Sequence, residues 1–320
     1  MGDRIAINAV DRIEILTLQD NYIDITAGDG SNIVLRAMPV RDGEIRASIL
    51  AEHGFSAIVK TTTGDRTRTM LFDFGFSEGG AAYNAGILGV DMGEVEAVAI
   101  SHGHSDHLGG FAKLLEMIGR KGIEFVTHPK VFHSPRYLKV GEDFRIYFPK
   151  FSREMAQKAG ATIVETEAPY RMLDGDVLFL GEIARVTDFE QGFPAAHFEM
   201  EGIEMWDPIE DDTSLVMNLR DRGLVVLSGC AHAGIINTVL YAREVTGVEA
   251  VHAVMGGFHL SGRAFEAIVD RTTEELMQIA PAYVIPTHCT GRKAIMTIEQ
   301  AMPDQFILNM SGTKLTFSAD

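Results

Sequence analysis

A cluster of histidines directly after an apolar run constrains this 320-residue chain more than any other feature of its sequence. The run VEAVAIS ends at Ser101 and is typical of a buried strand. The next six residues, HGHSDH, place three imidazoles and one carboxylate at His102, His104, Asp106 and His107. Because residues two apart on an extended segment point the same way, His102 and His104 can converge on one cation. Asp106 and His107 lie at the turn into the next helix and can face a second cation. Such donors suit zinc, iron or manganese better than calcium.

The alternative interpretation of this motif is an ordinary helix N-terminus. Ser105 or Asp106 would then cap the helix, and the histidines would be exposed to solvent. That interpretation explains one residue of the four. The whole chain has only 11 histidines, so a chance grouping of this density is rare. We therefore favour a metal site.

Three distant histidines each follow an apolar stretch, where an α/β scaffold usually presents its site. His232 follows GLVVLSGCA, His259 follows VHAVMGGF, and His288 follows AYVIPT. We expect His232 and His288 to contribute to the metal site. His259 is a candidate for either metal or substrate contact.

Strand patterns alternate with helix patterns in both halves of the chain. The expected strands are 12–18, 56–61, 69–74, 95–101, 214–219, 223–228, 248–255 and 283–286. The expected helices are 108–119, 235–244 and 262–279. This order predicts an α/β fold with two sheets covered by helices. With no low-complexity linker, we expect one domain over 1–320, with its core at about 50–292.

Composition narrows the function classes. Apolar residues make up 46% and charged residues 23%, as in soluble globular proteins. A net charge of −17 argues against nucleic acid as the partner, so a small-molecule substrate is expected. No run has the length of a membrane span, and residues 1–5 do not resemble a signal peptide. The only cysteines are Cys230 and Cys289, which cannot form a disulfide framework, and we expect a cytoplasmic protein.

The motif HGHSDH resembles the signature of the metallo-β-lactamase superfamily. The stretch LFDFG, which contains Asp73, matches the preceding strand, whose aspartate supports the site. NAGILGVD, GCAHAGIIN, GGFHL and PTHCTG fit a subgroup related to the archaeal dihydropterin–ribofuranosylaminobenzene 5'-phosphate synthase. The resemblance covers about residues 50–292.

The resemblance implies a fold and a set of ligands. The fold would be an αββα sandwich of two mixed sheets flanked by helices, with metals in a cleft at one edge. Segment 128–210 would cover the cleft. The two implied metal sites are His102, His104 and His232 for one cation, and Asp106, His107 and His288 for the other.

This chain departs from the family pattern at one position. Ser-Gly-Cys, ending at Cys230, stands where Ser-Gly-Asp would supply a bridging carboxylate, and Asp211-Asp212-Thr213 stands where a third histidine is usual. Cys230 is either a thiolate ligand or a small buried residue. We expect a buried spacer, because His232 can reach the same cation, and without the bridging carboxylate we expect the second metal to bind weakly.

The resulting hypothesis is metal-assisted hydrolysis of an ester, lactone, amide or phosphoester, or a transfer on a pterin- or phosphate-type substrate. One or two Zn²⁺ ions are expected, with Mn²⁺ or Fe²⁺ as alternatives. Asp106 would ligate the second metal, orient the nucleophile or accept its proton, and His259 would donate a proton or bind the developing anion. The rival functions are a mononuclear iron dioxygenase and a non-catalytic metal-binding module. The residues expected to have ordinary surface or packing roles are His53, His128, His133, His197 and Trp206.

Overall fold

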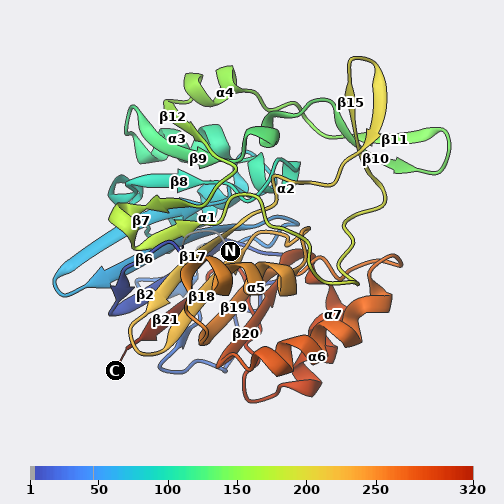
Figure 1. Ribbon diagram of the computed structural model, residues 1–320. Helices are drawn as coiled ribbons and strands as arrows, with labels where there is room; N and C mark the ends of the chain where they lie inside the picture. Colours follow the sequence, from blue (N-terminus) through green and yellow to red (C-terminus); the bar gives the residue numbers. More distant parts are fainter. Residues whose placement is uncertain (1–3, 46, 320) are drawn as a thin grey trace.

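The computed structural model describes residues 4–45 and 47–319 (Figure 1). Two β-sheets pack face to face, and helices cover the outer face of each. The αββα sandwich expected from the sequence is therefore confirmed. Residues 1–3 lie outside the described residues, as do residues 46 and 320. The expectation that residues 1–5 do not form a signal peptide therefore falls partly on residues that the structure does not describe. None of the described helices is long and apolar enough to cross a membrane.

The first sheet contains most of the strands of the N-terminal half and the last strand of the chain. Its strand order, over the described residues, is β12 (Ala161–Glu165), β9 (Ile123–Thr127), β8 (Ala97–Ala99), β7 (Arg66–Phe72), β6 (Ser56–Thr63), β2 (Arg12–Gln19), β21 (Lys314–Ser318) and β3 (Val34–Leu35). The strands from β7 to β12 run parallel, and the others are antiparallel. The histidine motif follows β8, which is buried along its whole length.

The second sheet brings the remaining site residues to the same edge. Its order is β13 (Tyr170–Met172), β14 (Val177–Phe179), β17 (Ser214–Leu219), β18 (Gly223–Ser228), β19 (Val251–Gly257) and β20 (Tyr283–Thr287), and β1 (Ala9–Val10) pairs with β17. The strands β18, β19 and β20 are parallel neighbours. Their carboxyl ends therefore lie side by side, which explains why residues far apart in the sequence can meet there.

Three apolar layers hold the sandwich together. Side chains such as Phe72, Phe179 and Met255 fill the space between the sheets. A second layer lies under the helices of the first sheet, and a third lies under those of the second sheet. The helices are α1 (Gly80–Leu88), α2 (Ser105–Leu108), α3 (Phe111–Ile118), α4 (Arg153–Lys158), α5 (Ile235–Thr246), α6 (Val269–Ile279) and α7 (Arg292–Ala301). Short 3-10 turns are η1 (Met92–Glu94), η2 (Pro129–Phe132), η3 (Leu173–Gly175), η4 (Glu266–Ile268) and η5 (His288–Thr290).

A small third sheet stands apart from the sandwich at the upper right of Figure 1. Its order is β11 (Phe144–Tyr147), β10 (Arg136–Val140), β15 (Ala196–Met200) and β16 (Ile203–Trp206), and a separate hairpin pairs β4 (Val40–Arg41) with β5 (Glu44–Ile45). Within 128–210, β12, β13 and β14 belong to the main sheets instead of covering the cleft. The third sheet and its flanks do line the cleft, through Leu138, Phe148 and Phe193.

The structure differs from the sequence prediction at two helices. The helix expected over 108–119 is divided into α2 and α3, because the amide of Gly109 bonds to Gly75 O and that of Gly110 to Phe74 O. The helix expected over 262–279 begins at Val269, after η4. Residues 262–265 form a loop on the cavity wall.

Strand boundaries shift by a few residues. The strand expected over 248–255 is β19, Val251–Gly257. The strand expected over 95–101 shortens to β8, Ala97–Ala99. The chain therefore leaves the strand after Ala99, and the histidine motif lies in the turn that follows.

Candidate metal centre

Three histidines from two sheets form what we call the first group: His102, His104 and His232. Their ligand atoms all lie within 4.8 Å of one another. The ring centroids are 4.5 Å apart for His102 and His104, and 4.7 Å apart for His102 and His232. His102 and His104 come from the turn after β8, and His232 comes from the turn after β18. The structure thus brings together the first set of ligands that the sequence analysis named.

The first group has donor atoms without partners. Nε2 of His102, Nε2 of His104 and both ring nitrogens of His232 are buried and make no hydrogen bond. A buried polar atom without a partner is costly, so this cluster needs a ligand to be satisfied. Burial lowers the pKa of His104 to about 4 and holds the pKa of His102 and His232 well below the usual value. The rings are neutral at pH 7 and present lone pairs, which fits a divalent cation.

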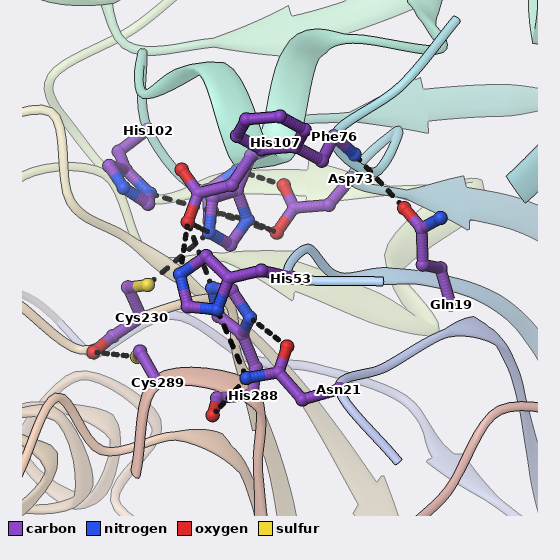
Figure 2. A network of polar contacts seen from close by, with 12 residues as sticks. Gln19, Asn21, His53, Asp73, Phe76, His102, His107, Cys230, His288 and Cys289 are labelled. Atoms are coloured by element: carbon purple, nitrogen blue, oxygen red, sulfur yellow. Dashed lines mark hydrogen bonds and ion pairs between the residues drawn. The ribbon is translucent and has the colours of Figure 1, made fainter. Parts of the chain in front are cut away.

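Four residues form the second group: Asp106, His107, Cys230 and His288. Their ligand atoms also lie within 4.8 Å of one another. His288 Nε2 is 3.0 Å from Asp106 Oδ2, and His107 Nε2 is 3.3 Å from Cys230 Sγ (Figure 2). The structure thus gathers the three predicted second-site residues and adds Cys230.

Asp73 lies outside both groups and orients a histidine of each, directly or through Ser101. Its Oδ1 accepts a hydrogen bond from Ser101 N at 2.7 Å, and its Oδ2 accepts from Ser101 Oγ at 2.8 Å. Oδ2 also lies 2.6 Å from His107 Nδ1, which therefore carries the proton and leaves Nε2 facing the second group (Figure 2). His102 Nδ1 lies 3.0 Å from Ser101 Oγ, so the same network orients His102. A carboxylate behind a histidine fixes the tautomer of a metal ligand in this way.

The charges of the second group also suit a cation. Burial opposes ionisation of Asp106, but His107 and the hydrogen bond from His288 outweigh it and hold the pKa of Asp106 well below its usual range. Burial lowers the pKa of His107, but the Asp73 and Asp106 carboxylates outweigh it and raise that pKa. The two carboxylates beside His107 thus favour positive charge at this position, as they would favour a cation.

The structure corrects the expected reason for the burial of Cys230. Its side chain is buried, as predicted, but it does not share a cluster with His232. Its sulfur lies in the second group, whereas His232 belongs to the first. Burial and the neighbouring Cys289 thiol raise the pKa of Cys230 well above the usual value, so without a cation it is a neutral thiol. The thiol therefore stands among the expected ligands of the second cation.

Sequence reasoning missed a buried clamp behind the first group. Arg136, on β10, donates from Nη1 to Asp211 Oδ2 at 2.8 Å, and its Nε is 2.8 Å from Asp207 Oδ2. Asp211 Oδ2 accepts from the amide of Gly103, between the two motif histidines, at 2.8 Å. Burial raises the pKa of Asp211, but Arg136 outweighs it and keeps the group ionised. In the sequence, Asp211 stands out only because Asp211-Asp212-Thr213 replaces the histidine that is usual before β17. No sequence motif points to Arg136.

One cavity of about 570 Å³ opens over both groups. His104, Asp106 and His288 form part of its lining, together with His259. Its apolar wall consists of Phe76, Leu138, Phe148, Phe193 and Phe265. Phe148 packs on His104 with ring centroids 4.7 Å apart. A small molecule in this cavity would contact both groups.

His259 lies beside the first group, with its ring centroid 4.1 Å from that of His232. Burial, and then the neighbouring histidines, lower the pKa of His259 to about 3. At pH 7 the ring is neutral and offers an N–H donor. Of the two roles expected for His259, binding a developing anion therefore fits better than donation of an imidazolium proton.

The other named side chains divide between the cavity rim and the packing. His53 is exposed, as expected, but it lies on the rim, with Nε2 3.7 Å from Asp106 Oδ2 and its ring against His288 (Figure 2). His128 caps η2 by accepting from the amide of Lys130. His133 stacks on Phe198 and His197 stacks near Tyr137, which are packing roles. Trp206 donates from Nε1 to Phe193 O at 3.0 Å and so supports the cavity wall.

Comparison with known proteins agrees with this geometry. Residues 53–182 match the family model described as the metallo-beta-lactamase superfamily. The chain is 28% identical over 296 residues to 7,8-dihydropterin-6-methyl-4-(β-D-ribofuranosyl)-aminobenzene-5'-phosphate synthase of Methanocaldococcus jannaschii, covering 90% of this chain and 91% of that protein. It is also 28% identical, over 268 residues, to an uncharacterized protein of the same organism, covering 81% and 92% of the two chains.

A solved structure supports the fold directly. The crystal structure of Tm1679, described as a metal-dependent hydrolase of the β-lactamase superfamily, superimposes with a TM-score of 0.71 at 24% identity. The match covers 96% of this chain and 99% of that one. Residues 53–182 therefore match the metallo-β-lactamase superfamily in sequence, and the whole chain has the fold of the Tm1679 structure.

Proposed function

We propose that this chain is a metal-dependent hydrolase that acts on an ester, lactone, amide or phosphoester of a small molecule. The observation that carries the proposal is the convergence of two buried donor sets on one cavity. The first group would hold one divalent cation and the second group another, with Zn²⁺ favoured by the imidazole and thiol donors. A cation held there supplies Lewis acidity and brings the pKa of a bound water toward neutrality.

Asp106 is the proposed proton acceptor. Its side chain lines the cavity, and the charges around it keep it ionised. His288 Nε2 lies 3.0 Å from Oδ2 of Asp106. The other oxygen of Asp106, Oδ1, would therefore orient the attacking water and accept its proton. Loss of this carboxylate should therefore slow turnover without emptying the first group.

His259 is the proposed donor to the developing anion. Its ring lies on the cavity wall, and its Nδ1 is buried without a hydrogen-bond partner. A neutral imidazole can give an N–H hydrogen bond to an oxyanion in the transition state. Phe193 and Phe265 pack against the ring at centroid distances of 5.0 and 4.6 Å and restrict its orientation.

The second candidate reaction is a transfer on a pterin- or phosphate-type substrate. The relative from M. jannaschii is named as a synthase, and the match spans most of both chains. The aromatic cavity wall suits a flat ring, and Arg263 on the same wall suits an anionic group. A mononuclear iron dioxygenase is less favoured, since the second group offers four donors for a second cation.

The proposal is tested by metal analysis and turnover on protein purified without added metal. We expect zinc in the protein, hydrolysis of phosphodiester or lactone substrates, loss of that activity on chelation, and recovery with Zn²⁺ or Mn²⁺. His104→Ala should lower metal affinity on the order of 10²-fold or more, because it removes a direct ligand.

The matched control is His197→Ala, which removes a histidine of the third sheet and should leave metal content and turnover unchanged. Iron content together with substrate-dependent oxygen uptake would contradict the hydrolase and favour the dioxygenase. Equal turnover of wild type and His104→Ala would contradict the role of the first group.

A further inference from the structure

Three soft or borderline donors follow three neighbouring parallel strands at the same offset. Cys230 lies two residues beyond the end of β18, His259 two beyond β19, and Cys289 two beyond β20. Cys230 and Cys289 are the only cysteines of the chain and are 59 positions apart. The fold therefore assembles both thiols and one imidazole at a single edge of the second sheet.

The three donor atoms are close enough to share a ligand. The sulfurs of Cys230 and Cys289 and a ring nitrogen of His259 lie within 4.8 Å of one another. Cys289 Sγ donates a weak hydrogen bond to Cys230 O at 3.6 Å (Figure 2). Small movements of the side chains would bring all three to the bond lengths of a tetrahedral cation, about 2.3 Å for sulfur and 2.0–2.1 Å for nitrogen.

Gly257 makes this arrangement possible. A Cβ at Gly257 would lie 2.5 Å from Cys289 Sγ and 3.2 Å from the Cα of Cys230. Any other residue at this position would clash with the Cys289 sulfur and displace it. The bare backbone of β19 thus leaves the space that the Cys289 sulfur occupies beside Cys230.

No disulfide and no hydrogen bond to Nδ1 of His259 has to break when a cation binds to these donors. Nδ1 of His259 is buried and unpartnered, and both cysteines are buried and free of disulfides. Cys289 and His259 line the cavity, which gives a cation a route to them. Two thiols and an imidazole are the donor set that thiophilic d¹⁰ cations prefer.

We propose that Cys230, His259 and Cys289 form a third, thiophilic cation site, for Zn²⁺ or Cd²⁺, which shares Cys230 with the second group and no residue with the first. On binding, each thiol releases its proton to solvent and donates a sulfur lone pair to the cation. When this site is filled, Cys230 is no longer a ligand of the second group. His259 then no longer offers an N–H donor to a substrate in the cavity. Excess thiophilic cation is therefore inhibitory, a consequence that rests on the proposed function.

Cadmium titration of the full-length protein tests the site, because each thiolate bound to Cd²⁺ adds sulfur-to-metal charge-transfer absorption. At saturation, we expect wild type to give about twice the absorption of Cys289→Ser, since two thiolates bind instead of one. Cys230→Ser/Cys289→Ser should give none. Equal absorption for wild type and Cys289→Ser would overturn the proposal, because Cys289 would then not be a ligand.

A second measurement uses unmodified protein and so does not depend on the folding of a variant. Alkylation by iodoacetamide, mapped by peptide mass, should label Cys289 in chelator and spare it in Cd²⁺, with Mg²⁺ as the control that gives no protection. Labelling of Cys289 at the same rate in Cd²⁺ and in chelator would overturn the site. The first group has no sulfur, so failure here leaves its metal content and turnover unaffected and is distinguishable from failure of the proposed function.

Discussion

Individual side chains decide which cation each group can hold. The first group consists of three neutral imidazoles whose unpartnered ring nitrogens can act as metal ligands. In the second, Asp106 brings a negative charge and Cys230 a thiol. The chemistry of the two positions therefore differs, and single substitutions separate them.

Asp106→Asn keeps the size of the side chain and removes its charge. We expect turnover to fall by about 10²–10⁴-fold, the range for loss of a general base, while the first cation stays bound. Steady-state kinetics with metal analysis checks both parts. Wild-type rates would show that Asp106 neither accepts the proton nor serves the second cation.

Cys230→Ser tests the thiol in the second group. Because serine is a much poorer ligand near neutral pH, the variant should lose one metal equivalent and keep the other. Cys230→Asp, which restores the carboxylate usual at this position, should retain both. The measurement is the metal-to-protein ratio after dialysis. An unchanged ratio in the serine variant would show that Cys230 is a buried spacer and not a ligand.

Acid should destabilise the metal-free protein through the buried histidines. The pKa of His104 and of His288 is lowered to about 4 in the folded state, mainly by burial, against about 6.5 unfolded. The folded state therefore binds fewer protons between these values, and its stability is lost as pH falls from about 6.5 through about 4. Urea unfolding in chelator at pH 7.5 and pH 5 should show a lower free energy of unfolding at pH 5, and equal values would contradict burial of neutral rings.

At the scale of elements, turns and buried ion pairs position the ligands. The motif turn after β8 is held from the third sheet by Arg136, through Asp211 to the amide of Gly103. The break between α2 and α3 lets the amides of Gly109 and Gly110 bond to Gly75 and Phe74, in the segment after β7 that also carries Asp73. These supports come from parts of the chain far from the motif.

Arg136→Met should be strongly destabilising and should weaken cation binding at the first group. It leaves Asp211 buried without its partner, which typically costs about 3–5 kcal/mol. The matched control is Arg145→Met on the same small sheet, whose solvent-screened pair with Glu204 should contribute little to stability. Chemical unfolding and zinc titration of both variants measure the contrast, and similar effects in the two would contradict the clamp.

Gly109→Ala should be among the most disruptive single-methyl changes. A Cβ at Gly109 would lie 1.7 Å from the carbonyl oxygen of Phe76, which is backbone and cannot rotate away. Gly86→Ala in α1 meets no atom within 4 Å and should cost little or stabilise slightly. Thermal melting of both proteins is the measurement, and a small shift for Gly109→Ala would mean that the turn tolerates a side chain.

At the scale of the whole molecule, hydrophobic pattern and strand-end placement are local signals, and they predicted two helix-covered sheets with the site residues gathered after the strands. The family resemblance implied the αββα sandwich and the division of six ligands into two sets. It could not predict that Cys230 faces the second group, since a buried thiol and a ligand thiol look alike in sequence. It could not reveal the Arg136 clamp or the Phe148 and Phe193 wall, because those contacts depend on how the third sheet docks. The helix expected over 108–119 is present as α3, but its start moved to Phe111 because tertiary bonds from the amides of Gly109 and Gly110 override local helix spacing.

The central claim is that two adjacent donor groups each hold a divalent cation under one cavity. The most direct test is a crystal structure of protein loaded with Zn²⁺, with anomalous scattering recorded at the zinc edge. The account predicts one peak about 2.0–2.1 Å from nitrogens of His102, His104 and His232, and a second bound by the second group, Asp106, His107, Cys230 and His288. Peaks only elsewhere, or no zinc peak in fully loaded protein, would contradict it.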